Sequence, residues 1–334
     1  MNVIMCRRLL ILDNSIRSFE NFRRNTFDQV AQNLGLDFTL HAPKSPYCFL
    51  FSALRFLQDL FFVRDKVVIL ITIPAIILAP LSILFTRKLI LFFPGLGRTY
   101  RGSDKKIRYI LLRLYLALCI KLSSRVVVLN KADKALLGGH TKISILNSEG
   151  LELSENLKIN KRNSYKNLSF VGRPIKDKGF EAFLDEIEFR NNEDLIYNFF
   201  GDGFEDKELE CRSDRLRKLF QNYIVHGYCE KTKIWKNTDI LFFPTVYGEG
   251  FPFVVLEALK HGCHIFLRHS HWTEHLPPVE TITFEKDKTL AKLIEDVEPV
   301  NITDQNATIV RQYLIDNHDI TTVVVPFWIE LIKD

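Results

Sequence analysis

The stretch FFPTVYGEGFPFVVLEALKHG, residues 242–262, decides how the whole chain is interpreted. An apolar run ends at Pro244, a glycine-rich turn follows, and apolar residues with helical spacing begin near Phe253. Gly248 and Gly250 permit backbone conformations that other residues resist, so this turn can bring backbone amides close to a ligand. The stretch therefore predicts a buried strand, a ligand-binding turn and a helix, which form one unit of a parallel α/β sheet.

The residues of this turn and helix are the first candidates for a binding site. The amides of Gly250 and Phe251, together with Pro252, lie near the predicted helix start at about Phe253, and a helix N-terminus carries about half a positive charge, which favours a phosphate. Glu249 is suited to accept the hydroxyls of a sugar, and Glu257, eight positions later, those of a ribose. The alternative is that Glu249 caps the helix and Glu257 is an exposed helix position.

Strand-like apolar runs recur along the chain with helical stretches between them. In the first half they are LLIL near 9, DFTLHA near 37, VVILIT near 67, KLILFF near 88 and RVVVLN near 125. In the second half they are LSFVGR near 168, IYNFFGDG near 196, YIVHG near 223, DILFFPT near 239, HIFLRH near 264 and TITF near 281. The polar segment 154–168 is the linker candidate. We therefore expect two Rossmann-like domains, 1–155 and 165–320, with functional residues in the loops after the strands.

The order Gly-Glu-Gly-Phe-Pro-x-Val-x-Leu-Glu-Ala-Leu-x-x-Gly at 248–262 resembles the Glu-x7-Glu signature of glycosyltransferase family 4, the retaining GT-B enzymes. The segment FVGRPIKDKGF is similar to the loop that holds two donor-diphosphate cations in this family, here Arg173 and Lys178 beside Gly172. The sequence GDG, with Gly201 and Gly203, is similar to the family's Gly-x-Gly turn. This resemblance covers the C-terminal half almost throughout.

The N-terminal half resembles the family only in patches. FFPGLGRTYRG and VVVLNKAD look like segments of members that act on lipid-linked sugars, so Gly95, Gly97 and Arg98 become acceptor-side candidates. Two features depart from the family pattern. The segment DNSIRSFENF after the first strand has no glycine, and RHSHWTEHL replaces a small-residue loop ahead of Glu274.

The resemblance implies a GT-B fold, with two Rossmann-like domains facing a cleft and residues 321–334 packing back on the N-terminal domain. It implies retaining transfer of a hexosyl or N-acetylhexosaminyl group from a nucleotide sugar, with UDP expected as the nucleotide. The expected acceptor is a glycan or a polyprenyl-diphosphate-linked sugar in the biosynthesis of a surface polysaccharide of O-antigen, capsule or lipopolysaccharide type.

The same resemblance implies how the site residues share the chemistry. Arg173 and Lys178 would neutralise the departing nucleoside diphosphate, because Arg grips phosphate bidentately and Lys acts as a point charge. We therefore expect neither a metal ion nor another cofactor. Glu249 is expected to position donor hydroxyls and stabilise positive charge at the sugar, without acting as a covalent nucleophile, and Glu257 to bind the ribose.

Other interpretations of these residues stay open. Arg173 and Lys178 could be solvated surface cations, and the GDG segment a plain turn. A catalytically silent subunit that binds a sugar nucleotide is the main alternative function. A nicotinamide or flavin oxidoreductase is a weaker one, because no Gly-x-Gly-x-x-Gly follows the first strand.

The charge and the cysteine content of the chain limit which binding partners and which cellular compartment we expect. The net charge of +5 gives no general affinity for nucleic acid. Residues 1–150 carry a net charge of +13 and residues 151–334 one of −8, so the two halves are expected to serve different partners. The 6 cysteines form no Cys-x-x-Cys pair, and no apolar core of a secretory signal precedes Asp13. A cytoplasmic protein with reduced thiols is expected.

Three apolar stretches raise the question of a membrane. Residues 67–85 are uncharged and just reach spanning length, but Pro74 suggests a buried strand followed by a helix instead. Residues 87–125 have a net charge of +9 and include a basic, strongly apolar helix, and residues 47–66 are rich in aromatics. These helices either bury their apolar residues against the sheet or dock on an anionic leaflet. We expect the protein to lie peripherally on the inner face of the cytoplasmic membrane.

Overall fold

The fold is described from a computed structural model of the chain. It describes residues 8–13, 20–43, 48–63, 65–97, 100, 107–154, 157–159, 166–188, 195–204, 223–245, 249–284 and 304–334. Two of the candidate site residues, Arg98 and Gly248, lie outside these ranges.

The chain forms two compact units that are not continuous in sequence. The first contains Met1–Glu152, Gly248–Phe251 and Asp316–Asp334, and the second contains Leu153–Tyr247 and Pro252–Ile315. This division differs from the boundaries expected from sequence, because the turn at 248–251 and residues 316–320 group with the first unit.

The sheet of the first unit contains, among the described residues, six parallel strands in the order β2-β1-β3-β4-β5-β6. They are β1 (Arg8–Asp13), β2 (Asp37–His41), β3 (Lys66–Ile71), β4 (Lys88–Phe93), β5 (Arg125–Val128) and β6 (Ile143–Ile145). The first five coincide with the apolar runs in the sequence. β3 is buried at every position, as expected for a parallel strand covered on both faces.

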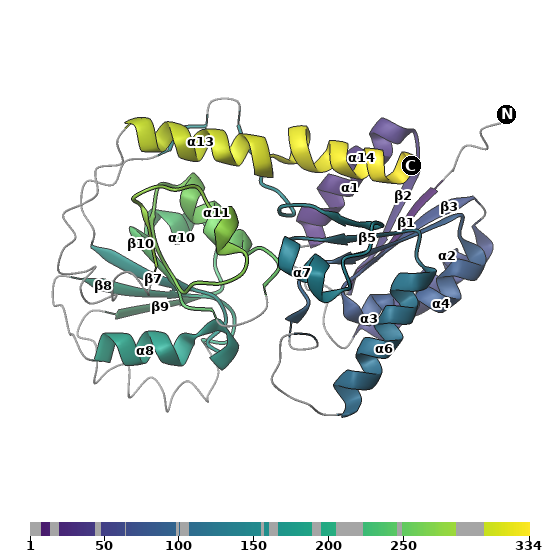
Figure 1. Ribbon diagram of the computed structural model, residues 1–334. Coiled ribbons are helices and arrows are strands. Elements are labelled where there is room, and N and C mark those ends of the chain that lie inside the picture. Colours follow the sequence, from purple (N-terminus) through teal and green to yellow (C-terminus); the bar gives the residue numbers. More distant parts are fainter. Residues whose placement is uncertain are drawn as a thin grey trace. The chain divides into compact units, whose positions relative to one another are not determined.

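Helices cover both faces of this sheet (Figure 1). One face carries α2 (Phe49–Phe62), α3 (Ile73–Ile76), α4 (Ala79–Ser82) with η2 (Ile83–Phe85), and α6 (Ile107–Leu122). The other carries α1 (Glu20–Leu34) and α14 (Val325–Lys333), while α7 (Lys131–Leu136) follows β5. The core beneath α2 and α6 includes Phe56, Leu60, Leu116 and Cys119.

The second unit has a parallel sheet in the order β12-β11-β10-β7-β8-β9 among its described residues. Its strands are β7 (Asn167–Val171), β8 (Ile196–Phe200), β9 (Tyr223–Gly227), β10 (Ile240–Phe243), β11 (His264–Leu267) and β12 (Ile282–Phe284). The helices among its described residues are η3 (Lys176–Lys178), α8 (Phe180–Glu188), α10 (Lys231–Lys236), α11 (Phe253–Lys260), η4 (Thr273–His275) and most of α13 (Asp304–His318). All six strands coincide with apolar runs in the sequence.

Each sheet has one point at which the strand order changes direction. In the first sheet this point lies between β1 and β3, and in the second between β7 and β10. Loops leave the carboxyl ends of such a strand pair in opposite directions, which opens a crevice where ligands of doubly wound sheets bind. The topology therefore directs attention to the loops after β7 and β10.

The apolar stretch at 67–85 is a strand followed by short helices. It contributes most of β3, then α3, α4 and η2, and Pro74 lies in the first turn of α3. The expected strand is confirmed, while two short helices and a 3-10 turn replace the single helix. No helix in the described ranges combines the length and the apolar character that a bilayer span requires.

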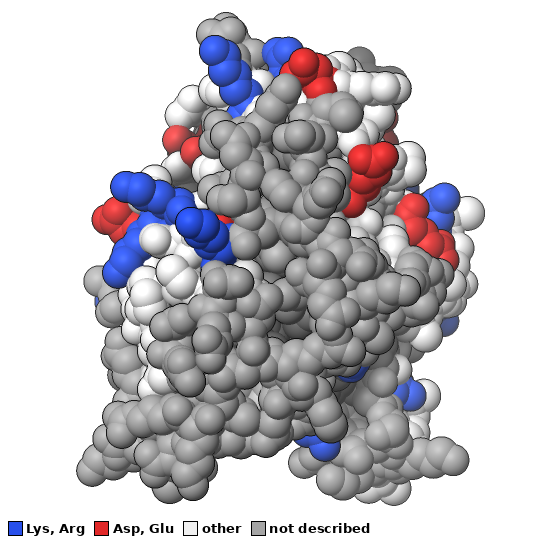
Figure 2. Space-filling model, turned by 90° about the vertical axis from the view of Figure 1, so that its left-hand side faces the viewer, with Lys and Arg blue, Asp and Glu red and all other residues white. Residues whose placement is uncertain are grey.

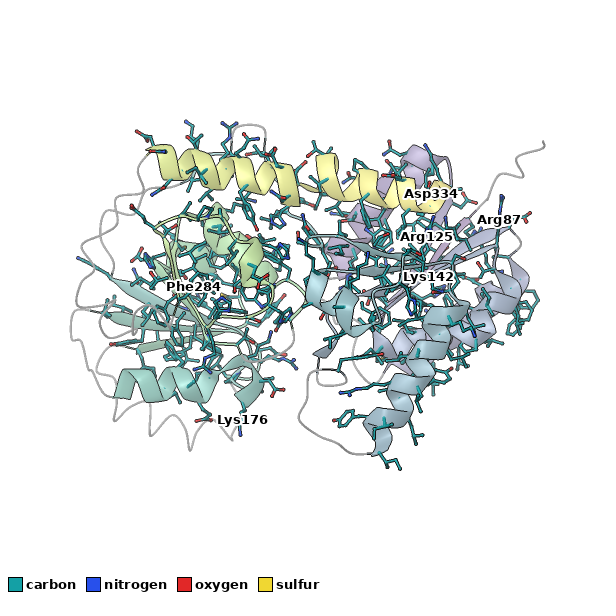
Figure 3. The ribbon with its side chains drawn as sticks, viewed as in Figure 1. Arg87, Arg125, Lys142, Lys176, Phe284 and Asp334 are labelled. Atoms are coloured by element: carbon teal, nitrogen blue, oxygen red, sulfur yellow. The ribbon has the colours of Figure 1, made fainter. Side chains whose placement is uncertain are left out.

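The end of the chain completes the first unit. A π-helical turn (η5, Ile320–Val324) joins α13 to α14, and α14 packs on α1. The buried Trp328 lies edge-on to Phe27 and Phe92, with ring centroids 5.0 and 5.5 Å away. At the last residue, Asp334 pairs with Arg125 at 3.7 Å (Figure 3).

Candidate functional site

The loops after β7 and β10 meet at the switch point of the second sheet. The hydroxyl of Thr245, two residues beyond β10, donates to the carbonyl of Asp177 in the loop after β7, at 3.2 Å. This bond connects the segment after Pro244 to the turn that contains Lys178. The fold thus brings two separately predicted parts of the donor site together at the carboxyl edge of the sheet.

The loop after β8 joins the same edge through close backbone contact. The amide of Gly172 donates to Phe200 at 2.8 Å, and Gly201 donates to Gly227 at 2.8 Å. Gly201 has a φ of 144°, and a Cβ at this position would collide with the carbonyl of Gly172. The first glycine of the GDG turn is therefore required for the close approach of two strand ends.

The two candidate cations follow Gly172 on this edge. Arg173 is exposed, and Lys178 is half-buried at the end of η3, two residues before the start of α8. Lys176 lies on the same turn and is exposed (Figure 3). Both candidate cations therefore lie at the switch point, where solvent reaches them.

The turn at 249–251, which we name the signature turn, is held inside the first unit by polar and steric contacts. The side-chain amide of the buried Asn130, which caps α7, donates to the carbonyl of Gly250 at 2.8 Å. A Cβ at Gly250 would collide with the carbonyl of Pro94, next to the acceptor-side candidate Gly95. Glu249 is half-buried in this turn.

Two neighbours of Gly250 extend this packing. The ring of Phe251 is buried and lies 5.2 Å from the ring of His318, and Pro252 is the N-cap of α11. On the other side of the turn, Gly97 follows the buried Leu96 with a φ of 52°. The turn at 249–251 and the loop after β4 therefore lie side by side within the first unit.

Glu257 is buried in α11 and has a cationic partner that sequence analysis missed. The ammonium of Lys231, at the start of α10, donates to Oε1 of Glu257 at 2.9 Å and lies 4.3 Å from the ring centre of Phe253. Nε2 of His261 is 3.9 Å from the second oxygen, Oε2. Glu257 is thus not the exposed helix position of the alternative interpretation. No pattern in the sequence indicates this pairing, because the two residues are 26 positions apart on different helices.

A buried ion cluster lies at the switch point of the first sheet. Arg23 pairs with Asp13, the last residue of β1, at 2.6 Å, and with Glu149 at 2.5 Å. Although burial opposes the charge of Arg23, the two carboxylates raise its pKa above the ordinary value. Arg23 is therefore a permanent cation that binds β1, α1 and the segment after β6 together.

His226 lies beside β8 in the second unit. Its ring stacks on Phe200 with 4.3 Å between centroids, and Nε2 is 2.9 Å from the side-chain oxygen of Asn198. Burial, and then the positive charge of Lys233, lower the pKa of His226 below 6.5. It is a neutral structural histidine at physiological pH. Among the described residues, no group of three His, Cys, Asp or Glu side chains is arranged to hold a metal ion.

Comparisons with known proteins agree on the fold. The family model described as glycosyl transferases group 1 matches residues 165–295, less than half of the chain. The sequence matches no curated protein. Among solved structures, Anabaena HepE in complex with UDP and glucose is similar with a TM-score of 0.70 and 14% identity, over 98% of this chain and 100% of HepE.

Two further structures are similar to this chain. The lipopolysaccharide outer core galactosyltransferase WaaB has a TM-score of 0.62 and 14% identity, over 98% of this chain and 99% of WaaB. TarM has a TM-score of 0.61 and 12% identity, over 86% of this chain and 58% of TarM. The two Rossmann-like units are those of the GT-B fold, which confirms the expected fold class.

Proposed function

We propose that this protein is a retaining glycosyltransferase that transfers a sugar from a nucleotide donor, with UDP as the expected nucleotide. The observation that carries the proposal is the convergence of Gly172, Arg173, Lys178 and Gly201 at the switch point of the second sheet. The match of residues 165–295 to glycosyl transferases group 1 and the similarity to UDP-bound HepE support it.

The proposed chemistry rests on charge at the leaving group. Departure of a nucleoside diphosphate leaves negative charge on the phosphates, which Arg173 and Lys178 can neutralise without reorganisation. Glu249 is proposed to hold the donor sugar and to stabilise the positive charge that develops at its anomeric carbon. In this scheme no metal ion takes part.

Donor hydrolysis without acceptor tests the proposal. UDP-, GDP- and ADP-sugars are incubated with the protein, and release of the nucleotide is followed. We expect slow hydrolysis of one donor class and a loss of about 100-fold or more in Arg173→Ala and Glu249→Ala. Lys176→Ala is the matched control, because Lys176 is an exposed cation of the same loop and is expected to have no effect (Figure 3).

The outcomes separate the alternatives. Donor binding with no turnover, with or without glycan fractions, would favour a silent sugar-nucleotide-binding subunit. Treatment with EDTA is expected to leave hydrolysis unchanged. Loss of activity in EDTA and its recovery with manganese would contradict the metal-independent scheme.

We further propose that the first unit docks on an anionic membrane surface, where a polyprenyl-diphosphate-linked sugar or another glycan of a surface polysaccharide serves as acceptor. Large apolar side chains are exposed on the outer sides of α2, η2 and α6: Leu50, Phe51, Leu54, Phe61, Phe62, Leu84, Phe85, Ile107, Ile110, Leu111, Leu114 and Leu118. The ring of Phe61 contacts that of Phe85 at 4.6 Å, and α4 packs on α6, so these elements form one layer. We name the outer side of this layer the apolar face.

Basic residues adjoin the apolar face. Arg87 follows η2 and is exposed, and Lys121 is exposed in the last turn of α6. The ammonium of Lys142 donates to the carbonyls of Lys121 and Ser123 at 2.9 and 3.0 Å, which places a third cation at the end of α6. Cations beside exposed apolar side chains suit an anionic leaflet, where each contributes about 1 kcal/mol.

Flotation with liposomes tests the membrane proposal separately. We expect binding to vesicles with anionic phosphatidylglycerol at low salt, weaker binding to neutral phosphatidylcholine, and loss of binding in Phe62→Ser/Leu114→Ser. Ile224→Ser, which removes an exposed apolar side chain of the second unit, is the control. Failure of the wild type to float would remove the membrane proposal and leave the transferase proposal intact.

A further inference from the structure

Lys231 occupies an unusual position for an exposed lysine. Its side chain is 61% exposed, yet its ammonium is fixed between two groups of α11, the carboxylate of Glu257 at 2.9 Å and the face of Phe253 at 4.3 Å. Phe253 and Glu257 are four residues apart on the first turns of α11, so they share one side of this helix. The ammonium therefore has two partners on α11 although most of its side chain is exposed.

The contact leaves one carboxylate oxygen for another partner. Oε1 of Glu257 accepts from Lys231, while Oε2 is 3.9 Å from Nε2 of His261, beyond hydrogen-bond distance. An ionised carboxylate accepts several hydrogen bonds, and one held at Oε1 presents Oε2 in a fixed direction. Vicinal hydroxyls are donors that such a carboxylate binds well.

The charge of Glu257 also needs a partner if a donor binds nearby. A buried carboxylate without a counter-ion is unfavourable, and it repels an incoming diphosphate. The side chain of Glu257 is only 8% exposed, and the ammonium of Lys231 reaches its carboxylate from the solvent side. This ion pair offsets the negative charge of the carboxylate. The arrangement therefore places a positive charge beside the carboxylate, which makes the site compatible with an anionic ligand.

We infer that Lys231 is a positioning residue for the donor, and that it fixes the Glu257 carboxylate so that the ribose hydroxyls of a nucleoside diphosphate bind to it. This inference rests on the proposed function, because it assumes that the second unit binds a nucleotide donor. It adds a specificity role for a residue on α10, outside the signature turn and outside the loop after β7 that contains Arg173 and Lys178. Lys231 acts through Glu257 and does not touch the reacting atoms.

The test compares ribose recognition in variants of Lys231. Affinities for UDP, GDP and ADP, and for their 2′,3′-dideoxy forms, are measured by titration calorimetry with the full-length protein. The wild type is expected to bind the ribonucleotide of its preferred base about 10- to 100-fold more tightly than the dideoxy form. Lys231→Met keeps the aliphatic stem on Phe253 and is expected to reduce this preference to less than about 3-fold.

Three further variants show whether the effect runs through Glu257. Lys231→Arg is expected to restore part of the preference, because it keeps the cation. Lys236→Met removes an exposed lysine from the same helix and is the matched control for charge. In the Glu257→Gln background, Lys231→Met is expected to cause no further change in the ribose preference.

The outcomes distinguish the inference from the proposed function. A Lys231→Met variant that melts at a lower temperature but keeps the full ribose preference would show a merely structural ion pair and overturn the inference. The same holds if Lys231→Met still alters the preference in the Glu257→Gln background. A wild type that binds none of the three nucleotides would refute the donor site itself, and with it the proposed function.

Discussion

Thr72 adopts a backbone conformation that glycine favours. It follows β3 at the switch point of the first sheet with a φ of 74°, and its buried hydroxyl has no hydrogen-bond partner among the described residues. A β-branched residue in this region stores about 1–3 kcal/mol of strain. Such strain at the carboxyl end of a strand is a feature of ligand-binding edges, and the fold retains it because β3 is buried on both faces.

Replacing Thr72 by glycine is therefore expected to stabilise the protein. Relief of the strain exceeds the entropy that glycine loses on folding, which leaves a net gain of about 1 kcal/mol. Urea unfolding measures the effect as a higher midpoint. Thr39→Gly, in the ordinary strand β2, is the control and is expected to lower the midpoint. A lower midpoint for Thr72→Gly would mean that its side-chain packing outweighs the strain.

His226 makes stability depend on pH with a defined sign. Its folded pKa lies below 6.5, because burial and Lys233 disfavour the charged ring. The unfolded chain therefore takes up a proton at a higher pH than the folded protein does. Stability is lost as the pH falls below 6.5, until the lowered pKa is passed.

Urea midpoints at about pH 7.5 and about pH 5.5 measure this contribution. His226→Gln keeps a donor toward Asn198 but does not titrate, so its midpoint is expected to fall less on acidification than that of the wild type. His41, whose pKa burial also lowers, remains in both proteins and cancels in the comparison. Equal losses in the two proteins would exclude His226 as a source.

The two glycines of the GDG turn differ in whether the structure has room for a side chain at their positions. Gly201 and Gly203 both have positive φ, but only a Cβ at Gly201 would meet backbone, whereas one at Gly203 would lie 3.6 Å from the side chain of Pro174. The first contact cannot relax without moving the end of β7. Replacing Gly201 by a larger residue therefore requires the backbone to move, whereas replacing Gly203 meets only a side chain.

Gly201→Ala is expected to abolish nucleotide binding at concentrations at which Gly203→Ala still binds. The reason is that a displaced Gly172 carries Arg173 away from the switch point. A thermal-shift screen measures this, because a ligand at 100 times its dissociation constant stabilises by about 2.7 kcal/mol. Equal behaviour of the two variants would show that the approach of Gly201 to Gly172 is not required.

The first unit as a whole depends on the end of the chain. Trp328 of α14 is buried against Phe27 of α1 and Phe92 of β4, so residues more than 200 positions apart share one core. Trp328→Ala is expected to lower the free energy of unfolding of this unit by about 3–5 kcal/mol. Glu330→Ala, an exposed position on the same helix, is the control and is expected to change it by less than about 0.5 kcal/mol. A small effect of Trp328→Ala would mean that α14 is dispensable.

The sequence by itself determined the strands of both sheets and the glycine turns after them. The central strands are covered on both faces and are therefore apolar throughout, so they appear as continuous runs, and every described strand except β6 coincides with a predicted run. β6 was not predicted, because its three residues, ISI, are too few to be distinguished from a loop. The resemblance to glycosyltransferase family 4 implied the candidate cations and glycines, and the architecture agrees, because they lie in loops that follow strands, at the ligand-binding edge of such a sheet.

Only the tertiary structure decided which polar groups act together. Asn130 and Gly250 are 120 positions apart, Arg23 and Glu149 are 126 apart, and Lys231 and Glu257 are 26 apart. Apolar periodicity records which side of an element is buried, but a single hydrogen bond between distant segments leaves no periodic trace in the sequence. The pairing of Lys231 with Glu257 therefore follows from how α10 and α11 pack on their sheet.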